Sequence, residues 1–158
     1  MDINKHLQRK FLVVVDGTPE SHSAVYFAAR RAHGTGGKVT LLLILDKENY
    51  SHWLGVGNLI QEEARAEAEA VLRELAVLIE DLGGDKPEQH IREGQAVTVI
   101  RELLAEDSTI STLVLASGTD PSGPGPLVSA LARGKTEFPI PVTVIPGGLS
   151  DEEIDALT

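Results

Sequence analysis

The fold is decided by the stretch Phe11-Leu12-Val13-Val14-Val15-Asp16-Gly17-Thr18-Pro19-Glu20. Its five apolar residues, three of them valines, are typical of a strand that is covered on both faces of a sheet. Thr18 then suits a helix N-cap, Pro19 the first helical position, and Glu20 the positive end of the helix dipole. The stretch therefore predicts a buried strand that turns directly into a helix.

The same alternation continues along the chain. We expect further strands at 39–45, 88–93, 112–116 and 142–145, and helices at 19–33, 59–82, 96–106 and 127–133. This order predicts a parallel α/β sheet with right-handed crossovers. Only Ile91 is strongly apolar in the third strand, and Pro141 and Pro146 flank the fifth, so we place both strands at sheet edges. Ser150 suits the N-cap of a last short helix, and the alternative is a disordered tail.

The length and composition fit a single domain. The chain has 158 residues, no cysteine and a net charge of −10. We expect an N-terminal extension (1–10), one α/β domain (11–147) and a C-terminal tail (148–158). The negative charge argues against non-specific binding to nucleic acid or to an anionic membrane. The N-terminus has no apolar signal region, and no apolar run approaches the ~20 residues of a membrane span, so we expect a cytoplasmic protein.

Two loops are candidates for a ligand site. Asp16-Gly17-Thr18 follows the first expected strand, and the Gly/Pro-rich stretch 117–126 follows the fourth. In an open parallel sheet, ligands bind beyond the carboxyl ends of the strands, where the strand order reverses. Glycines let a ligand approach the backbone, and helix N-termini offer N–H groups to an anion. The alternative is that these glycines serve only as turn residues.

Several segments, taken in order, match those of a known family. They are Val13–Thr18 with Ser21 and Ala24, Leu43–Asp46, Glu93-Gly94, Leu113–Leu115, and Pro141–Val144. Over nearly its whole length the chain thus resembles the universal stress protein family. The resemblance implies a five-stranded parallel sheet in the order 3-2-1-4-5 with helices on both faces, related to the adenine nucleotide alpha hydrolase fold. It also implies a role in stress survival and a homodimer paired through the fifth strand, at Val142 and Val144.

The resemblance also implies a candidate nucleotide site. Many members of the family bind ATP, and others do not, so ATP or AMP with magnesium is the implied ligand. The implied site residues are Asp16, Gly17, Thr18 and Ile44 around the adenosine, and Gly118, Gly123 and Gly125 after the fourth strand.

The phosphate loop departs from the family pattern Gly-x-x-Gly-x9-Gly-Ser/Thr. Gly118 is in place, but Pro121 stands where the second glycine belongs. If Gly125 is the last glycine, the loop is several residues short and Pro126 replaces the hydroxyl residue. Pro124 and Pro126 have no N–H group for a phosphate. We therefore expect adenosine binding to be possible and triphosphate binding to be impaired.

Three other sequence patterns resemble catalytic or metal sites, but we interpret each of them as a structural feature. Gly134-Lys135-Thr136 resembles the end of a P-loop but follows a helix, so we interpret it as a helix C-terminus that ends in glycine. In Ser21-His22-Ser23, adjacent helical side chains point about 100° apart, which argues against a catalytic pair. Asp46, Glu48 and His52 share a loop that we interpret as solvated, and we expect no metal site.

Three functions remain open from the sequence. The favoured one is a dimeric stress-response protein that acts through protein partners and binds no nucleotide. The second is an adenine-nucleotide binder. The third, a slow ATP hydrolase, is the least favoured, because we find no catalytic base and no P-loop lysine. We therefore expect no catalytic residue and a binding protein rather than an enzyme.

Overall fold

The computed structural model describes residues 9–46 and 57–158. The elements are β1 (Lys10–Val15), α2 (Pro19–Thr35), β2 (Lys38–Leu45), α3 (Gly57–Asp81), β3 (Glu88–Glu93), α4 (Ala96–Glu106), β4 (Ile110–Ser117), α5 (Pro126–Ala132), β5 (Val142–Pro146) and α6 (Asp151–Leu157). Every strand and helix expected from the sequence is present, with ends displaced by no more than two residues. The expected solvated loop with Glu48 and His52 lies outside the described residues.

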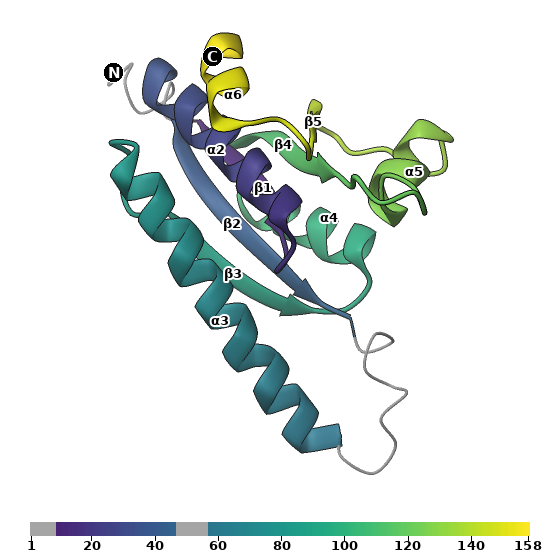
Figure 1. The fold of residues 1–158 in the computed structure, drawn as a ribbon. Helices are drawn as coiled ribbons and strands as arrows, with labels where there is room; N and C mark the ends of the chain where they lie inside the picture. Colours follow the sequence, from purple (N-terminus) through teal and green to yellow (C-terminus); the bar gives the residue numbers. More distant parts are fainter. Residues whose placement is uncertain (1–8, 47–56) are drawn as a thin grey trace.

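The strands form one parallel sheet in the order β3-β2-β1-β4-β5, as the family resemblance implies. β1 lies in the middle, where Val13 is in register with Leu41 of β2 and Val114 of β4. β3 and β5 lie at the two edges, which confirms the placement drawn from their composition. The carboxyl ends of all five strands therefore meet along one side of the molecule (Figure 1).

Helices cover both faces of the sheet and create two apolar cores. Leu12 packs into the core beneath α4, whereas Val13 packs into the core beneath α2 and α3, and both side chains are fully buried. Successive strand residues point to opposite faces, so a strand buried on both faces must be apolar at every position. This explains the unbroken apolar run of β1. In Figure 1, α2 and α3 lie in front of the sheet and α4 lies behind it.

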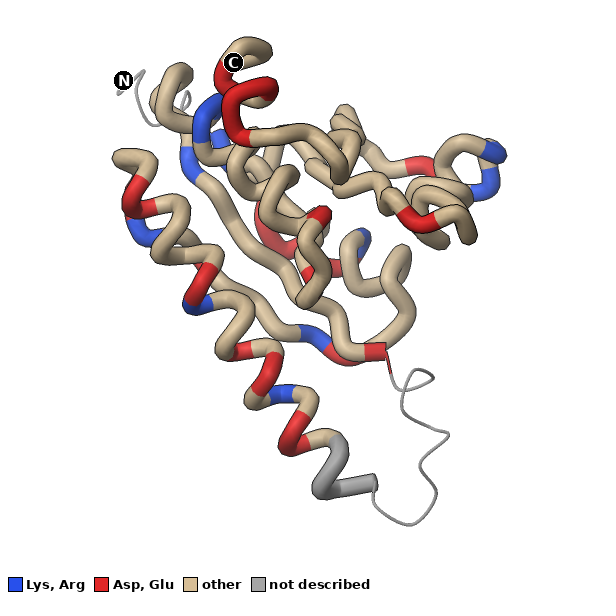
Figure 2. The backbone as a smooth tube through the Cα atoms, viewed as in Figure 1, with Lys and Arg blue, Asp and Glu red and all other residues tan. Residues whose placement is uncertain are grey.

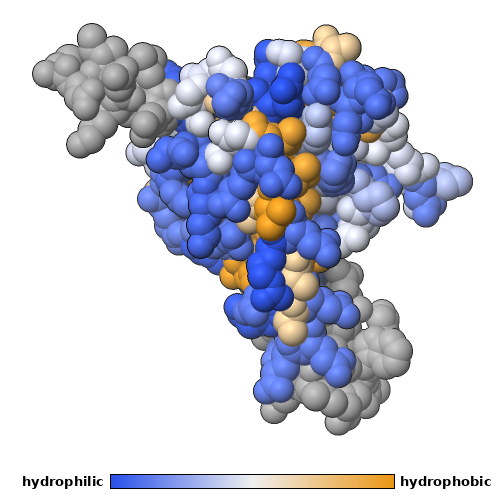
Figure 3. Space-filling view, turned by 60° about the vertical axis from the view of Figure 1, so that its left-hand side comes forward, coloured by the Kyte–Doolittle hydropathy of each residue, from blue (hydrophilic) through white to orange (hydrophobic). Residues whose placement is uncertain are grey.

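The long helix α3 packs only one of its sides against the sheet. Its partly buried apolar residues that contact the core are Ala64, Val71 and Leu78. Figure 3, which brings this side of the molecule forward, shows a narrow apolar band between hydrophilic surfaces. A narrow band with polar flanks is what an amphipathic helix on a sheet leaves at the surface. Among the described residues, no helix is both long and apolar enough to cross a membrane.

The C-terminal residues form the helix alternative rather than a disordered tail. Ser150 and Glu153 make a reciprocal capping box at the start of α6. Ile154 is fully buried, and the Tyr26 hydroxyl of α2 donates to Asp155 Oδ1 at 2.9 Å. The Ser23 hydroxyl donates to the carbonyls of Gly147 and Leu149. The segment from β5 to α6 is thus packed against α2.

Candidate functional site

A cleft of about 640 Å³ opens at the carboxyl ends of β1, β2 and β4. Its floor comes from the ends of these strands, and its rim from the starts of α2, α4 and α5 and from the loop 118–126. In the sheet, β1 lies between β2 and β4. The chain runs from β1 outward to β2 and β3 on one side and then crosses to β4 and β5 on the other, so the cleft lies where the strand order reverses. This is the position where open parallel sheets bind their ligands.

Six of the seven residues proposed from the sequence line this cleft. They are Asp16, Thr18, Ile44, Gly118, Gly123 and Gly125. Gly17 does not line it; it lies beside a smaller hollow against α3, where its missing Cβ would be 3.8 Å from Val71. The structure thus brings the two candidate loops together and turns Gly17 away from the space between them.

The walls of the cleft include several apolar side chains. Val14 and Ile44 at the strand ends and Leu127 and Val128 of α5 are partly buried there and also pack against the core beneath α4. Ligand pockets are usually lined by apolar groups with a few polar groups for orientation.

Asp16 is held rigidly at the mouth of the cleft. Its Oδ1 accepts hydrogen bonds from the Thr18 backbone N–H at 2.9 Å, from the Thr18 hydroxyl, and from the Ser21 hydroxyl at 2.9 Å. The Ser21 oxygen in turn accepts from the Asp16 N–H at 2.9 Å. Thr18 is the N-cap residue of α2 by position, but its side chain makes no capping bond because it bonds to Asp16 instead. Ser21 therefore positions Asp16.

The loop after β4 uses most of its own backbone donors. The N–H groups of Gly118 and Gly123 donate to carbonyls of the loop, at 2.9 and 3.0 Å. Those of Thr119 and Ser122 donate to carboxylate oxygens of Glu20 and Asp120. A cradle for phosphate needs several free N–H groups that point at one place. The satisfied donors, together with the three prolines at 121, 124 and 126, do not provide one.

Glu20 is a site residue that sequence reasoning missed. Its Oε1 accepts from the Thr119 hydroxyl at 2.9 Å, which ties the first turn of α2 to the loop after β4. Hydrogen bonds from its own backbone N–H and from the Thr119 side chain lower the pKa of Glu20 to about 2. Its position just after the first strand was the available signal, since residues there face the carboxyl end of the sheet. Glu20 is ionised at neutral pH.

The described lining of the cleft is acidic. Its charged side chains are those of Asp16, Glu20, Asp46 and Asp120, and no Lys, Arg or His is among the described residues that line it. Figure 2 shows basic positions beyond the far end of α5 and others on β3 and α4. α5 is followed by Gly134, which has the left-handed conformation at φ 68°, as expected for a helix C-terminus rather than for a P-loop.

No catalytic group emerges from the remaining motifs. The Ser21 hydroxyl bonds to Asp16, whereas His22 Nε2 lies 3.0 Å from Asp151 Oδ1 of α6, so the two neighbours have separate partners. Within residues 9–46 and 57–158, no group of three acidic or histidine side chains is placed to hold a metal ion.

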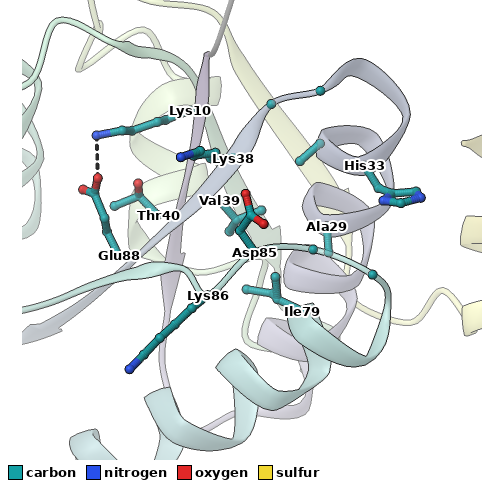
Figure 4. Close-up of a pocket in the computed structure, with 15 residues that line it drawn as sticks. Lys10, Ala29, His33, Lys38, Val39, Thr40, Ile79, Asp85, Lys86 and Glu88 are labelled. Atoms are coloured by element: carbon teal, nitrogen blue, oxygen red, sulfur yellow. Dashed lines mark ion pairs between the residues drawn. The ribbon is translucent and has the colours of Figure 1, made fainter.

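Another hollow, of about 250 Å³, lies at the opposite end of the sheet. Figure 4 shows Lys10 pointing toward Glu88, while Lys86 and His33 point away from the centre. Lys10 Nζ lies 2.7 Å from a carboxylate oxygen of Glu88 and 2.7 Å from one of Asp107. Its charge is therefore already compensated, and this hollow is smaller and farther from the predicted site residues than the cleft.

Comparisons with known proteins agree with this architecture. A model of the universal stress protein family matches residues 8–146. The solved structure of universal stress protein UspA from Lactobacillus plantarum is similar at 20% identity, with a TM-score of 0.70, and the match covers 87% of this chain and 97% of that one. No match was found among curated proteins.

Two similar solved structures contain a nucleotide. One is a universal stress protein in complex with cAMP, at 20% identity and a TM-score of 0.66, covering 90% of this chain and 99% of the other. The second is the universal stress protein from Archaeoglobus fulgidus in complex with dAMP, at 19% identity and a TM-score of 0.60, covering 88% and 98%. At these identities the likeness concerns the fold, whereas the family model spans most of the sequence. The chain belongs to the universal stress protein family.

Proposed function

We propose that this protein binds the adenosine part of an adenine nucleotide in the cleft and holds its phosphates weakly or not at all. The observation that carries the proposal is the cleft itself, which lies at the reversal of strand order and is lined by six of the seven residues implied by the family. The solved family members in complex with cAMP and dAMP support an adenine ligand. Of the functions left open by the sequence, this geometry favours nucleotide binding over a protein that binds none.

The cleft has suitable groups for both parts of a nucleoside. Val14, Ile44 and Leu127 offer apolar walls to a purine ring. The Oδ1 atom of Asp16 already accepts three hydrogen bonds, so Oδ2 is the carboxylate oxygen that can accept one from a ribose hydroxyl. Burial of a ring against apolar walls with one fixed carboxylate as acceptor gives both affinity and orientation.

A calorimetric titration of nucleotide-stripped protein tests the proposal. We expect adenosine or AMP to bind with a Kd of about 100 μM or better, and magnesium ATP to bind no more tightly than AMP. Ala96 begins α4 and lines the cleft, so Ala96→Trp should fill the space and weaken binding at least about tenfold. Ala66, exposed on α3, provides the matched control Ala66→Trp. Absence of heat with adenosine, AMP and magnesium ATP alike contradicts the proposal.

A second proposal concerns assembly. We infer a homodimer that pairs through β5 and acts in the stress response through protein partners in the cytoplasm. β5 is an edge strand with one open side, and Val144 on it is 39% exposed. Open strand edges and exposed apolar side chains are sites at which chains pair. Val142 lies on the same strand and is partly buried.

A further inference from the structure

We propose that the cleft selects adenine nucleosides by the charge of their 5′ substituent and prefers a neutral or cationic group to a phosphate. This inference rests on the proposed function, because it assumes that the cleft binds the nucleoside. It goes further by naming the class of ligand. The departure of the loop from the family's phosphate pattern would then be a functional feature, because it would suit a ligand that has no phosphate.

The first argument is that carboxylates of the chain itself occupy amide donors of the loop. The Thr119 N–H donates to Glu20 Oε1 at 3.4 Å, and the Ser122 N–H donates to Asp120 Oδ1 at 2.9 Å. Backbone N–H groups in a glycine-rich loop are the usual partners of a bound phosphate. Here two of them hold side-chain anions of the protein. A phosphate would have to displace these carboxylates or bind without the donors that they occupy.

The second argument is electrostatic. Glu20 belongs to the first turn of α2, Asp120 to the loop after β4, and Asp16 follows the end of β1, and all three line the same cleft. Arg133 and Lys135 follow α5 and are not among the lining residues. Like charges that are several ångströms apart near a protein surface repel each other by an amount equivalent to about a tenfold loss of affinity per unit charge. The same carboxylates attract a cationic substituent, so its affinity should rise where that of a phosphate falls.

The third argument is that this negative charge is present at neutral pH and is not taken up by a metal ion. Hydrogen bonds from its own N–H and from Thr119 keep the pKa of Glu20 at about 2, so its charge persists at every physiological pH. In the described part of the chain, the acidic side chains do not converge into a group that holds a metal ion. The carboxylates would therefore act on a bound ligand through their negative charge rather than by coordinating a metal ion.

The test compares three ligands that differ only at the 5′ position. Adenosine, AMP and 5′-amino-5′-deoxyadenosine, whose amine is protonated at neutral pH, are titrated into the nucleotide-stripped protein by calorimetry at low ionic strength and again at high ionic strength. Because the phosphate of AMP carries more than one negative charge at neutral pH, we expect AMP to bind at least about tenfold more weakly than adenosine, and the amino compound to bind at least as tightly as adenosine. Added salt should reduce the differences, because it screens charge.

Charge-removing variants identify the residues responsible. In Glu20→Gln and Asp120→Asn the side-chain oxygen can still accept its loop N–H, so the turn is retained while the charge is lost. We expect the ratio of the AMP and adenosine Kd values to fall several-fold in the double variant. Glu80→Gln, an exposed position near the end of α3, should leave that ratio unchanged.

The outcomes separate this inference from the proposed function. If AMP binds more tightly than adenosine, or if the ratio of the two Kd values is the same in the double variant as in the unmodified protein, the charge selection is wrong while nucleoside binding stands. If none of the three ligands binds, the proposed function fails and the inference fails with it.

Discussion

The carboxylate of Glu20 and the hydroxyl of Thr119 meet at 2.9 Å across 99 residues of sequence. Glu20 belongs to the first turn of α2, and Thr119 to the loop after β4, so this contact joins the two sides of the cleft. It also places a negative charge beside the loop after β4, near which the proposed nucleotide would carry its phosphates. The shape of the cleft and its proposed selectivity therefore depend on the same contact.

Glu20 should make stability depend on pH in the acid range. The folded protein holds the pKa of Glu20 at about 2, well below the value of 4.5 for a free glutamate. Its contribution is fully present above that ordinary value and is lost as the pH falls toward about 2, because the unfolded chain takes up the proton first. We expect urea unfolding of Glu20→Gln to depend less steeply on pH between about 4.5 and 2 than that of the unmodified protein. Equal slopes would show that the carboxylate is not held in this way.

Gly147 should not tolerate a side chain. A Cβ there would collide with the carbonyl oxygen of Ser117 and with the side chain of Glu20. The carbonyl belongs to the end of β4 and accepts from the Gly147 N–H at 3.0 Å, so neither group can easily move away. We expect Gly147→Ala to lower the free energy of unfolding by about 1–3 kcal/mol, measured by chemical denaturation.

The next residue provides the control for Gly147. A Cβ on Gly148 would meet Thr119 at an ordinary contact distance of 3.6 Å. Gly148→Ala should therefore change the free energy of unfolding by no more than about 0.5 kcal/mol. Similar losses in the two variants would contradict the close approach of β4 and the segment after β5.

Lys10 should stabilise the amino end of the sheet. Its side chain is 18% exposed and lies 2.7 Å from Asp107, which is 21% exposed. Burial alone would raise the pKa of Asp107, but hydrogen bonds from Lys10 and Thr109 outweigh it and lower that pKa below its usual value. Lys10→Met should cost about 1–2 kcal/mol in the free energy of unfolding and raise the pKa of Asp107 seen by NMR. Lys86→Met, at a side chain that points away from the hollow in Figure 4, should do neither.

The proposed dimer predicts a specific effect of charge on β5. Val144→Lys should convert a dimer of 16.9 kDa chains into monomers, as measured by light scattering, because a lysine on an edge strand opposes pairing. Val77 is more exposed, at 54%, but lies on α3, so Val77→Lys should leave the assembly unchanged. A monomer before any substitution would contradict the proposed dimer.

Much of the fold was predictable from the sequence, because apolar runs and helix signals are local. The run at 11–15 and the Thr18-Pro19-Glu20 cap marked β1 and the start of α2 correctly. The side-chain bonds of the cleft were not predictable in this way. That Thr18 bonds to Asp16 and Glu20 to Thr119 depends on turn geometry and on contacts between distant segments. The orientation of Gly17 away from the cleft is a detail of the same kind.

The central claim is that an adenine nucleoside occupies the cleft at the carboxyl ends of the strands, and NMR of the backbone amides tests it most directly. On addition of adenosine to isotope-labelled protein, the account predicts shifts at Ile44, Ala116 and Gly118 and none at Lys38 and Gly83, which line the hollow at the opposite end. Shifts confined to that hollow, or no shifts at saturating adenosine, would contradict it.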